Sequence, residues 1–435
     1  MTHKVEQLFL AALAFFWCFL MWFATAAFAP AIAADYGLTK ADLALLASSA
    51  IWLAPAGRIL AGWASDRIGA RNVFVIILTY SGLFSIASAF ATSYSFLFFT
   101  RLIVATSGVS FVVGIQHVAQ WFEKDEIGTA EGLYAGTGNA GAGVGALLLP
   151  RIYHLNYQSA FLMLGIVSLL IAVLYYVRGV SAKNKETAET VKKTANLRNT
   201  LYVWTRWAAI TLMLAYAMSF ALEIAMNAWL SSYYKIGFSA QMADLGYTQL
   251  DQIQVAAGTF GSVQSFNASL FRPFSGYMSD VFQRRKWMPY PLITKNLPYS
   301  PRIHWLMTAL LCITLSMIAM TVVGMLGLLT WSVVILAIFG ITVSFGTGGT
   351  FAIVPLIFKE RVGTATGFIG GISTAFGIVY PLIFGAFDNI HVGYAVVALT
   401  MFIPFILFFI FAMRYDEHPE NFGLGSSKFW LGGEN

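Results

Sequence analysis

Repeated apolar runs of about 20 residues constrain this chain more than any other feature of its sequence. A run of this length crosses the hydrocarbon core of a bilayer as one helix. Of the 435 residues, 58% are hydrophobic and only 11% are charged, against about 25% charged in a soluble domain. We therefore expect an all-α membrane protein with twelve transmembrane helices. The candidate spans, numbered in chain order, are 8–34, 41–64, 73–92, 95–121, 127–150, 158–180, 203–234, 251–281, 303–328, 331–358, 361–388 and 391–414.

The distribution of positive charge orients these spans. An even number of spans puts both termini on one side, and the segments on that side contain 20 of the 26 lysines and arginines. The opposite side contains three, and the last three, Arg58, Arg101 and Arg272, lie inside spans. Because cytoplasmic loops carry the excess of Lys and Arg, we expect both termini in the cytoplasm and the chain in the inner (plasma) membrane. The first run is too long for a signal-peptide core and is expected to remain as a span.

Two pairs of similar segments divide the chain into related halves. Residues 57–71 read GRILAGWASDRIGAR and residues 271–285 read FRPFSGYMSDVFQRR, with their shared residues 214 positions apart. Residues 128–136 read GTAEGLYAG and residues 363–371 read GTATGFIGG, 235 positions apart. Internal duplication is common in multi-spanning membrane proteins. We expect one six-helix half at 1–180, a cytoplasmic linker at 181–202, a second six-helix half at 203–414 and a cytoplasmic tail at 415–435.

The first pair of segments resembles a known motif. The stretch GWASDRIGAR resembles the loop between the second and third helices of the major facilitator superfamily, and GYMSDVFQRR lies where that superfamily repeats it. The resemblance implies two pseudo-symmetric six-helix halves, with a monomer as the default. It also implies that Asp66, Arg67, Arg71 and Asp280 act in gating, because such an aspartate can cap a helix N-terminus and pair with loop arginines.

Arg58 and Arg272 are the most informative charges inside the spans. A charge in mid-bilayer costs at least a few kcal/mol, so it needs a partner or a purpose. The two arginines hold equivalent positions in the halves and should face each other across a central cavity. Their planar forks, without a carboxylate nearby on their own spans, favour a site for a planar or tetrahedral anion. The alternative is that each side chain extends to the cytoplasmic interface, which for Arg58 lies about 12 Å away.

Span 5 is rich in glycine. Gly132, Gly136, Asn139 and Gly143 recur at spacings of four, three and four residues, which places them on one helix face. Glycine at this density allows helices to pack closely, and it also exposes peptide groups to a small ligand. The string G-x3-G-x-G-N-x-G-x-G, which includes Gly138, resembles the signature of the nitrate/nitrite porter family within the superfamily. That resemblance implies that Gly136, Gly138 and Asn139 bind the anion.

Spans 7 and 11 extend this resemblance. Span 7 contains YAMSFALEIAMNAWLSSYY (216–234), similar to the seventh helix of the family, and Tyr216 and Phe220 match positions that contact the anion. Span 11 contains GFIGGISTAFGIVYP (367–381) and resembles the second glycine signature, but it lacks the Asn–Gly pair that many members carry. A backbone or hydroxyl contact from Ser373 or Thr374 is one replacement for the missing amide.

Glu223 bears on how transport is coupled. It lies at helical spacing from Tyr216 and Phe220, and a buried carboxyl can exchange protons near neutral pH. The antiporter branch of the family is described as lacking such a residue, so Glu223 favours proton symport. The alternatives are a structural ion pair with Arg101 or a position at the lipid headgroups. Glu131, at the cytoplasmic start of span 5, is the second candidate for a proton carrier.

The sequence lacks the motifs of several other functional classes. It has no GxxxxGK[ST] loop for nucleotide hydrolysis, and no HExxH or clustered Cys/His pattern for a metal. No Ser/His/Asp constellation stands out. The net charge of +6 does not indicate nucleic-acid binding, because the cations lie in the loops between spans. We therefore expect neither a cofactor, a nucleic-acid partner nor an enzymatic activity.

Together these features favour a secondary transporter of nitrate or nitrite that works by alternating access and takes a proton with the anion across the lipid bilayer. Three alternatives stay open. The first is exchange of nitrate for nitrite without a proton, and the second is transport of an organic anion. The third is a transporter-like receptor, which the short cytoplasmic segments disfavour.

Overall fold

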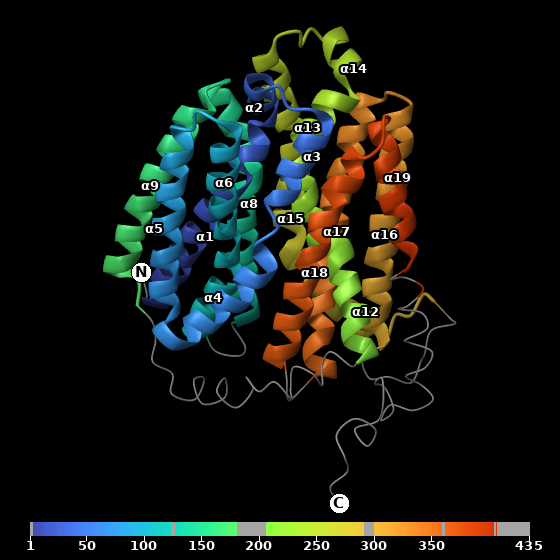
Figure 1. The fold of residues 1–435 in the computed structure, drawn as a ribbon. Helices are drawn as coiled ribbons and strands as arrows, with labels where there is room; N and C mark the ends of the chain where they lie inside the picture. The colour runs from blue at the N-terminus through green and yellow to red at the C-terminus, as the bar shows by residue number, and fades with distance from the viewer. Residues whose placement is uncertain are drawn as a thin grey trace, which may run out of the picture.

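The computed structural model describes residues 3–122, 127–180, 206–290, 300–358, 362–403 and 406, and within these ranges every regular element is a helix. The helices up to α9, in blue to blue-green, stand beside those from α12 onward, in light green to red (Figure 1). The N-terminus lies at the lower end of the bundle, and α2 and α14 lie at the opposite end. The predicted linker and tail fall outside the described residues.

The first half runs from α1 to α9. Its elements are α1 (His3–Ala27), α2 (Ala29–Tyr36), α3 (Lys40–Ser49), α4 (Ala54–Ile68), α5 (Ala70–Ala89), α6 (Tyr94–Ala105), the 3-10 turn η1 (Thr106–Val109), α7 (Ser110–Ala119), α8 (Ile127–Tyr153) and α9 (Tyr157–Arg178).

The second half runs from α12 to α19. Its elements are α12 (Trp207–Tyr216), the π turn η2 (Ala217–Ala221), α13 (Leu222–Gly237), α14 (Ser239–Asp244), α15 (Leu250–Arg285), α16 (Ser300–Met325), α17 (Leu329–Ile357), α18 (Val362–Gly385) and α19 (Ile390–Thr400).

The described helices account for the predicted spans. Nine helical segments within the described ranges are long and apolar enough to cross a membrane. Helices α8 and α15, which match spans 5 and 8, have 27 and 36 residues and are also long enough, at about 1.5 Å per residue. They are less apolar because α8 is rich in glycine and α15 carries many Ser, Gln and Asn residues. Helix α19 matches the start of span 12, and residues 404–405 and 407–414 of that span lie outside the described chain.

Four predicted spans are interrupted rather than continuous. Span 1 is divided between α1 and α2, and span 2 between α3 and α4. Span 4 passes through η1, and span 7 passes through the π turn η2. A single π turn within an α-helix is frequent at functional sites. Here η2 contains Phe220, with Tyr216 directly before it and Glu223 shortly after.

The two halves meet along three seams. Helix α8 packs against α15, α18 packs against α3 and α4, and α13 packs against α1, α2 and α3. The first two seams are related by the internal repeat, since they join span 5 to span 8 and span 11 to span 2. Glycine permits close approach at the α8–α15 seam, where a Cβ added to Gly136 would lie 3.1 Å from the Ser269 carbonyl oxygen.

Gln254 joins the halves at the end of the bundle opposite the N-terminus. Its buried amide accepts a hydrogen bond from the backbone nitrogen of Ala31 at 3.0 Å and donates one to the His154 carbonyl at 2.5 Å. Ala31 lies in the first turn of α2 and His154 directly follows α8, so one side chain satisfies two groups that helix ends leave unpaired. Lys40 adds a bond from α3 to the Asp388 carbonyl, at 3.4 Å.

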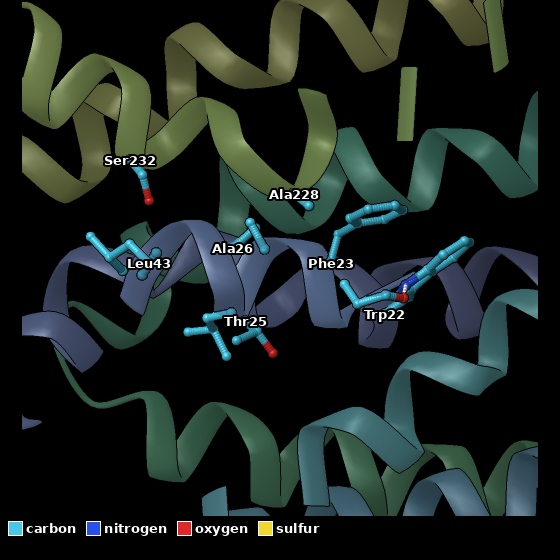
Figure 2. Close-up of a pocket in the computed structure, with 11 residues that line it drawn as sticks. Trp22, Phe23, Thr25, Ala26, Leu43, Ala228 and Ser232 are labelled. Atoms are coloured by element: carbon cyan, nitrogen blue, oxygen red, sulfur yellow. Dashed lines mark hydrogen bonds between the residues drawn. The ribbon is translucent and has the colours of Figure 1, made fainter. Parts of the chain in front are cut away.

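A small pocket lies at the seam between α1, α3 and α13. Figure 2 shows Trp22, Thr25 and Leu43 on one side of it, with Ala228 and Ser232 of α13 opposite. None of the residues that line it is charged. Its polar side chains are those of Trp22, Thr25 and Ser232, so it offers no positive charge to pair with an anion.

Candidate anion-binding site

Arg58 lies on α4, with its guanidinium turned into the bundle. Its Nη1 donates to Thr374 Oγ1 at 2.9 Å and, more weakly, to the Gly370 carbonyl at 3.4 Å, both on α18. Only 5% of the residue is exposed. Its other two nitrogens, Nε and Nη2, are buried and have no hydrogen-bond partner among the described residues.

These two unpaired donors add to the electrostatic cost of the site, as does Arg272 Nε, which is also buried without a partner among the described residues. Burying a charged donor without an acceptor costs several kcal/mol, and each such group in a folded protein calls for an explanation. Nε and Nη2 form one edge of the guanidinium, which can donate two parallel hydrogen bonds to the same acceptor group. Arg58 therefore presents a buried fork that an anion can satisfy.

Arg272, on α15, is balanced differently. Its Nη2 contacts both oxygens of Glu223, at 2.8 and 2.7 Å, and both residues are buried. The Asn139 amide of α8 donates to Glu223 Oε1 across the seam between the halves. The Glu223 carboxylate thus comes from α13, whereas Arg58 and Arg272 lie on α4 and α15. Of the partners that the sequence left open for Glu223, Arg101 is wrong, and the structure places Arg272 there instead.

Arg101 has a separate environment. It donates to Thr25 Oγ1 at 2.6 Å and to the Met21 carbonyl at 2.5 Å, and it lies over the Phe161 ring at 4.3 Å. All these partners belong to the first half. Arg101 therefore ties α6 to α1 and does not contribute to the central cluster.

Aromatic rings connect the two central arginines. The Phe220 ring lies 4.8 Å from the Arg58 guanidinium and 5.9 Å from that of Arg272. Tyr216 stacks on Phe220 at 5.2 Å, and Phe111 lies 5.9 Å from Arg58. Each ring face is electron-rich and attracts a cation, so the rings hold the arginines without supplying a competing anion. The Tyr216 hydroxyl attracts Arg58 and forms a loose side-chain hydrogen bond with it, but the geometry is too poor to give Nε or Nη2 a well-formed partner.

The glycines of α8 divide between two faces. Gly136 faces Ser269 on α15. Gly132 faces Pro273 on the same helix, which would lie 3.9 Å from a Cβ added to the glycine. Gly138 instead packs directly against the Phe15 ring of α1. Gly136 thus lies on the seam with α15 and Asn139 contacts Glu223 of α13, whereas Gly138 belongs to the packing of α8 on α1.

The predicted gating residues lie at the loop ends of α4, α5 and α15. Asp280 pairs with Arg302 of α16 at 2.7 Å. Arg67 lies over the Trp63 ring at 4.1 Å, and Arg71 bonds the Tyr176 carbonyl on α9. The side chain of Asp66 lies outside the described part of the structure. In the second half, the motif aspartate Asp280 therefore joins α15 to α16. A residue that stabilises the loop end of these helices should make such a contact.

Thr374 is the clearest addition to the cluster. The sequence suggests it, together with Ser373, as a replacement for the missing amide of span 11. Its number exceeds that of Asn139 by 235, the offset of the second repeat, so the two residues are equivalent in the halves. Ser373 instead donates to the Met213 carbonyl at 2.6 Å. Phe111 could not be found from sequence, because no spacing links it to the other site residues.

Comparison with known proteins identifies the class of this chain. The model of the Major Facilitator Superfamily matches residues 11–294, which is more than half of the sequence. The chain belongs to the Major Facilitator Superfamily and is a multi-pass membrane protein with the two-halved fold of that superfamily.

Individual relatives indicate a narrower group within the superfamily. The chain is 26% identical to the nitrate/nitrite transporter NrtP of Picosynechococcus sp., covering 84% of this chain and 82% of that protein. It is also 26% identical to the probable nitrate/nitrite antiporter NarK1 of Thermus thermophilus, with 93% and 89% covered. The nitrite extrusion protein of Bacillus subtilis is 24% identical, with 95% and 96% covered. These matches confirm the resemblance to nitrate/nitrite porters.

Solved structures support the fold. A bacterial homologue of the human lysosomal transporter Spinster matches with a TM-score of 0.65 at 16% identity, covering 95% of this chain and 98% of that chain. A single-residue mutant of the nucleoside transporter NupG matches with a TM-score of 0.67 at 13% identity, covering 94% and 99%.

Proposed function

We propose that the protein is a transporter, not an enzyme, and that it carries nitrate or nitrite across the plasma membrane by alternating access. The buried, unpartnered Nε–Nη2 edge of Arg58 carries this proposal. The names of the relatives point to the same two anions.

The charges of the central cluster favour a small monovalent anion. Arg58 and Arg272 contribute two positive charges and Glu223 one negative charge, which leaves the cluster with one net positive charge. One nitrate or nitrite ion neutralises it. With Glu223 ionised, the bound anion leaves no uncompensated charge when the halves close, and with Glu223 protonated it lowers the charge of the cluster from two to one. The Phe220 and Phe111 rings beside Arg58 favour a compact, weakly hydrated ion over a large organic one.

Proton coupling follows from the ion pair between Arg272 and Glu223. As long as the carboxylate is ionised, it occupies the guanidinium that the anion needs. A proton on Glu223 removes that negative charge, weakens the ion pair and releases Arg272 toward the anion. The proton and the anion then favour each other's binding, which is the thermodynamic requirement for symport.

Exchange of nitrate for nitrite is the second candidate function. It is favoured by the name of the T. thermophilus relative and by the completeness of the Glu223 ion pair. If Glu223 stays ionised throughout the cycle, Arg58 alone binds the anion, and the empty carrier keeps its net positive charge. Exchange requires that the empty carrier, with this charge uncompensated, does not return, whereas symport requires that it does.

Proton movement in proteoliposomes distinguishes these functions. External nitrate is added to vesicles that contain a pH dye, with the membrane potential clamped by valinomycin. We expect nitrate to acidify the lumen of vesicles with the wild-type protein, and Glu223→Gln to abolish acidification while it still exchanges nitrate. Glu131→Gln, which changes the other candidate carboxyl, should still acidify.

Three results would contradict parts of the proposal. Acidification by Glu223→Gln at the wild-type rate would remove Glu223 as the proton carrier. Acceleration of nitrate entry by internal nitrite, with no acidification in any variant, would establish exchange. Failure of the wild type to move either anion would overturn the proposed function itself. We also propose that the protein works as a monomer with both termini in the cytoplasm.

A further inference from the structure

We propose that Thr374 is a positioning residue that turns the Nε–Nη2 edge of Arg58 toward the bound anion, in the place that Asn139 holds in the other half. This inference rests on the proposed anion site. Thr374 would then determine which edge of the Arg58 guanidinium contacts the anion.

The hydrogen bonds of Thr374 determine what it can do. Its hydroxyl donates to the Gly370 carbonyl at 2.7 Å within α18, so its only hydrogen is used there. Its oxygen then accepts from Arg58 Nη1 at 2.9 Å. A hydroxyl has one donor and two acceptor positions, and Thr374 is fully buried. It can therefore hold the guanidinium, but it has no hydrogen left to donate to an anion.

Holding Nη1 fixes the free edge of Arg58. A guanidinium has two forks suited to a pair of oxygens, one formed by Nη1 and Nη2 and one by Nε and Nη2. Thr374 blocks the first fork. The second is the pair of atoms that are buried and unpartnered. A planar anion with two oxygens can accept both hydrogen bonds of this fork at once, whereas a spherical halide offers a single centre.

The two halves thus use equivalent positions with opposite polarity. Asn139 donates, and its partner is the Glu223 carboxylate. Thr374 accepts, and its partner is Arg58 itself. Arg58 is consequently held in place before an anion arrives, whereas Arg272 is bound to a carboxylate that must leave. Thr374 therefore makes Arg58 the first point of contact for the anion.

The experiment compares Thr374→Val, which keeps the shape but loses the hydroxyl, with Thr374→Ser, which keeps the hydroxyl. Thr347→Val is the matched control, because the buried Thr347 hydroxyl bonds the Val343 carbonyl of its own helix and lies in none of the arginine contacts described above. Nitrate KM and kcat and the inhibition constant of chloride are measured in proteoliposomes. A cryo-EM structure of Thr374→Val shows the orientation of Arg58.

We expect Thr374→Val to raise the nitrate KM about tenfold, as the loss of one charge-assisted hydrogen bond implies, with a smaller change in kcat. Discrimination of nitrate against chloride should fall, because Nη1 becomes available and the guanidinium is no longer held to one fork. Thr374→Ser and Thr347→Val should keep the wild-type KM and discrimination.

A wild-type KM and discrimination in Thr374→Val would overturn the inference and leave the proposed function intact. The same holds if Thr374→Ser is impaired as strongly as Thr374→Val. If the wild type transports no nitrate, the proposed function fails, and the structure of Thr374→Val then decides the positioning role. An Arg58 guanidinium that keeps its wild-type orientation in that variant would show that Thr374 does not set it.

Discussion

Arg58 and Arg272 hold equivalent positions in the two halves, yet their charges are balanced in different ways. Arg272 has a carboxylate at 2.7 Å, whereas Arg58 has a hydroxyl, a distant carbonyl and two aromatic rings. An ion pair inside a membrane offsets most of the cost of both charges, whereas hydroxyl and ring contacts offset only part of it. The difference gives the cluster one site that is ready for an anion and one that must first be released.

Substitution of either arginine by lysine should abolish nitrate uptake. An ammonium keeps the charge but cannot donate two parallel bonds to one anion, so we expect uptake to fall at least about 100-fold in Arg58→Lys and in Arg272→Lys. Arg178→Lys, at the exposed end of α9 and paired with Glu6 of the same half, is the control and should transport normally. Near-normal uptake in both central variants would contradict a two-arginine site.

Replacing Phe220 by leucine tests the ring between the arginines. Leucine keeps most of the apolar volume but has no π face, so each guanidinium loses about 0.5–2 kcal/mol of attraction. We expect the nitrate KM to rise roughly threefold to tenfold. Phe339→Leu changes an equally buried ring that lies outside the described arginine cluster. It should lower the melting temperature similarly and leave KM unchanged, so a similar rise in KM in both variants would contradict a specific role for the Phe220 ring.

At the scale of elements, α8 has two glycine faces with different tolerances. A Cβ on Gly141 would collide with the backbone carbonyl of Phe16 on α1, which cannot rotate away. A Cβ on Gly132 would meet nothing closer than the Pro273 side chain at 3.9 Å. The first face therefore fixes the distance between α8 and α1, whereas the face toward α15 has room at Gly132 but not at Gly136, where an added Cβ would lie 3.1 Å from the Ser269 carbonyl oxygen.

Alanine substitutions measure this difference. We expect Gly141→Ala to destabilise the protein by about 1–3 kcal/mol, as overpacking does elsewhere, and Gly132→Ala to be nearly neutral. Thermal unfolding in detergent, followed by fluorescence-detected size-exclusion chromatography, reports both. Equal melting temperatures for the two variants would show that α8 and α1 do not pack as closely as the structure places them.

At the scale of the whole molecule, the halves are tied together at the end opposite the N-terminus. Gln254 and Lys40 bond across the seams there, while the arginine cluster lies further along the same bundle. The proposed alternating access requires these bonds to break whenever the site opens to that end of the bundle. Their free energy therefore helps to set the balance between the two states of the carrier.

Removal of the Gln254 amide should shift that balance. In Gln254→Leu, the Ala31 nitrogen and the His154 carbonyl lose their partner, so the closed outer end becomes less stable by about 1–3 kcal/mol. We expect a cysteine placed at Ala47 to react several-fold faster with a membrane-impermeant maleimide. Gln252→Leu, on the exposed first turn of α15, should leave the rate unchanged. An unchanged rate in Gln254→Leu would remove Gln254 from the outer closure.

Much of the architecture was predictable from the sequence because lipid leaves few alternatives. A chain that crosses a bilayer must satisfy its backbone hydrogen bonds internally, so apolar runs of this length become helices. The repeat offsets placed Arg58 opposite Arg272 and made Asn139 equivalent to Thr374. The positions of these residues along their helices, and their aromatic neighbours in span 7, therefore follow from the order of residues alone.

The partners of these residues depended on the tertiary structure. Spacing along one helix does not fix its rotation against another helix, and the π turn η2 shifts the face of every residue that follows it. For that reason sequence could not tell whether Glu223 pairs with Arg272 or Arg101, or that Gly138 faces α1. The sequence by itself determined the helices, the halves and the charged positions. Only the packing of α4, α8, α13, α15 and α18 decided which charges are paired, because pairing depends on contacts between helices that are remote in the chain.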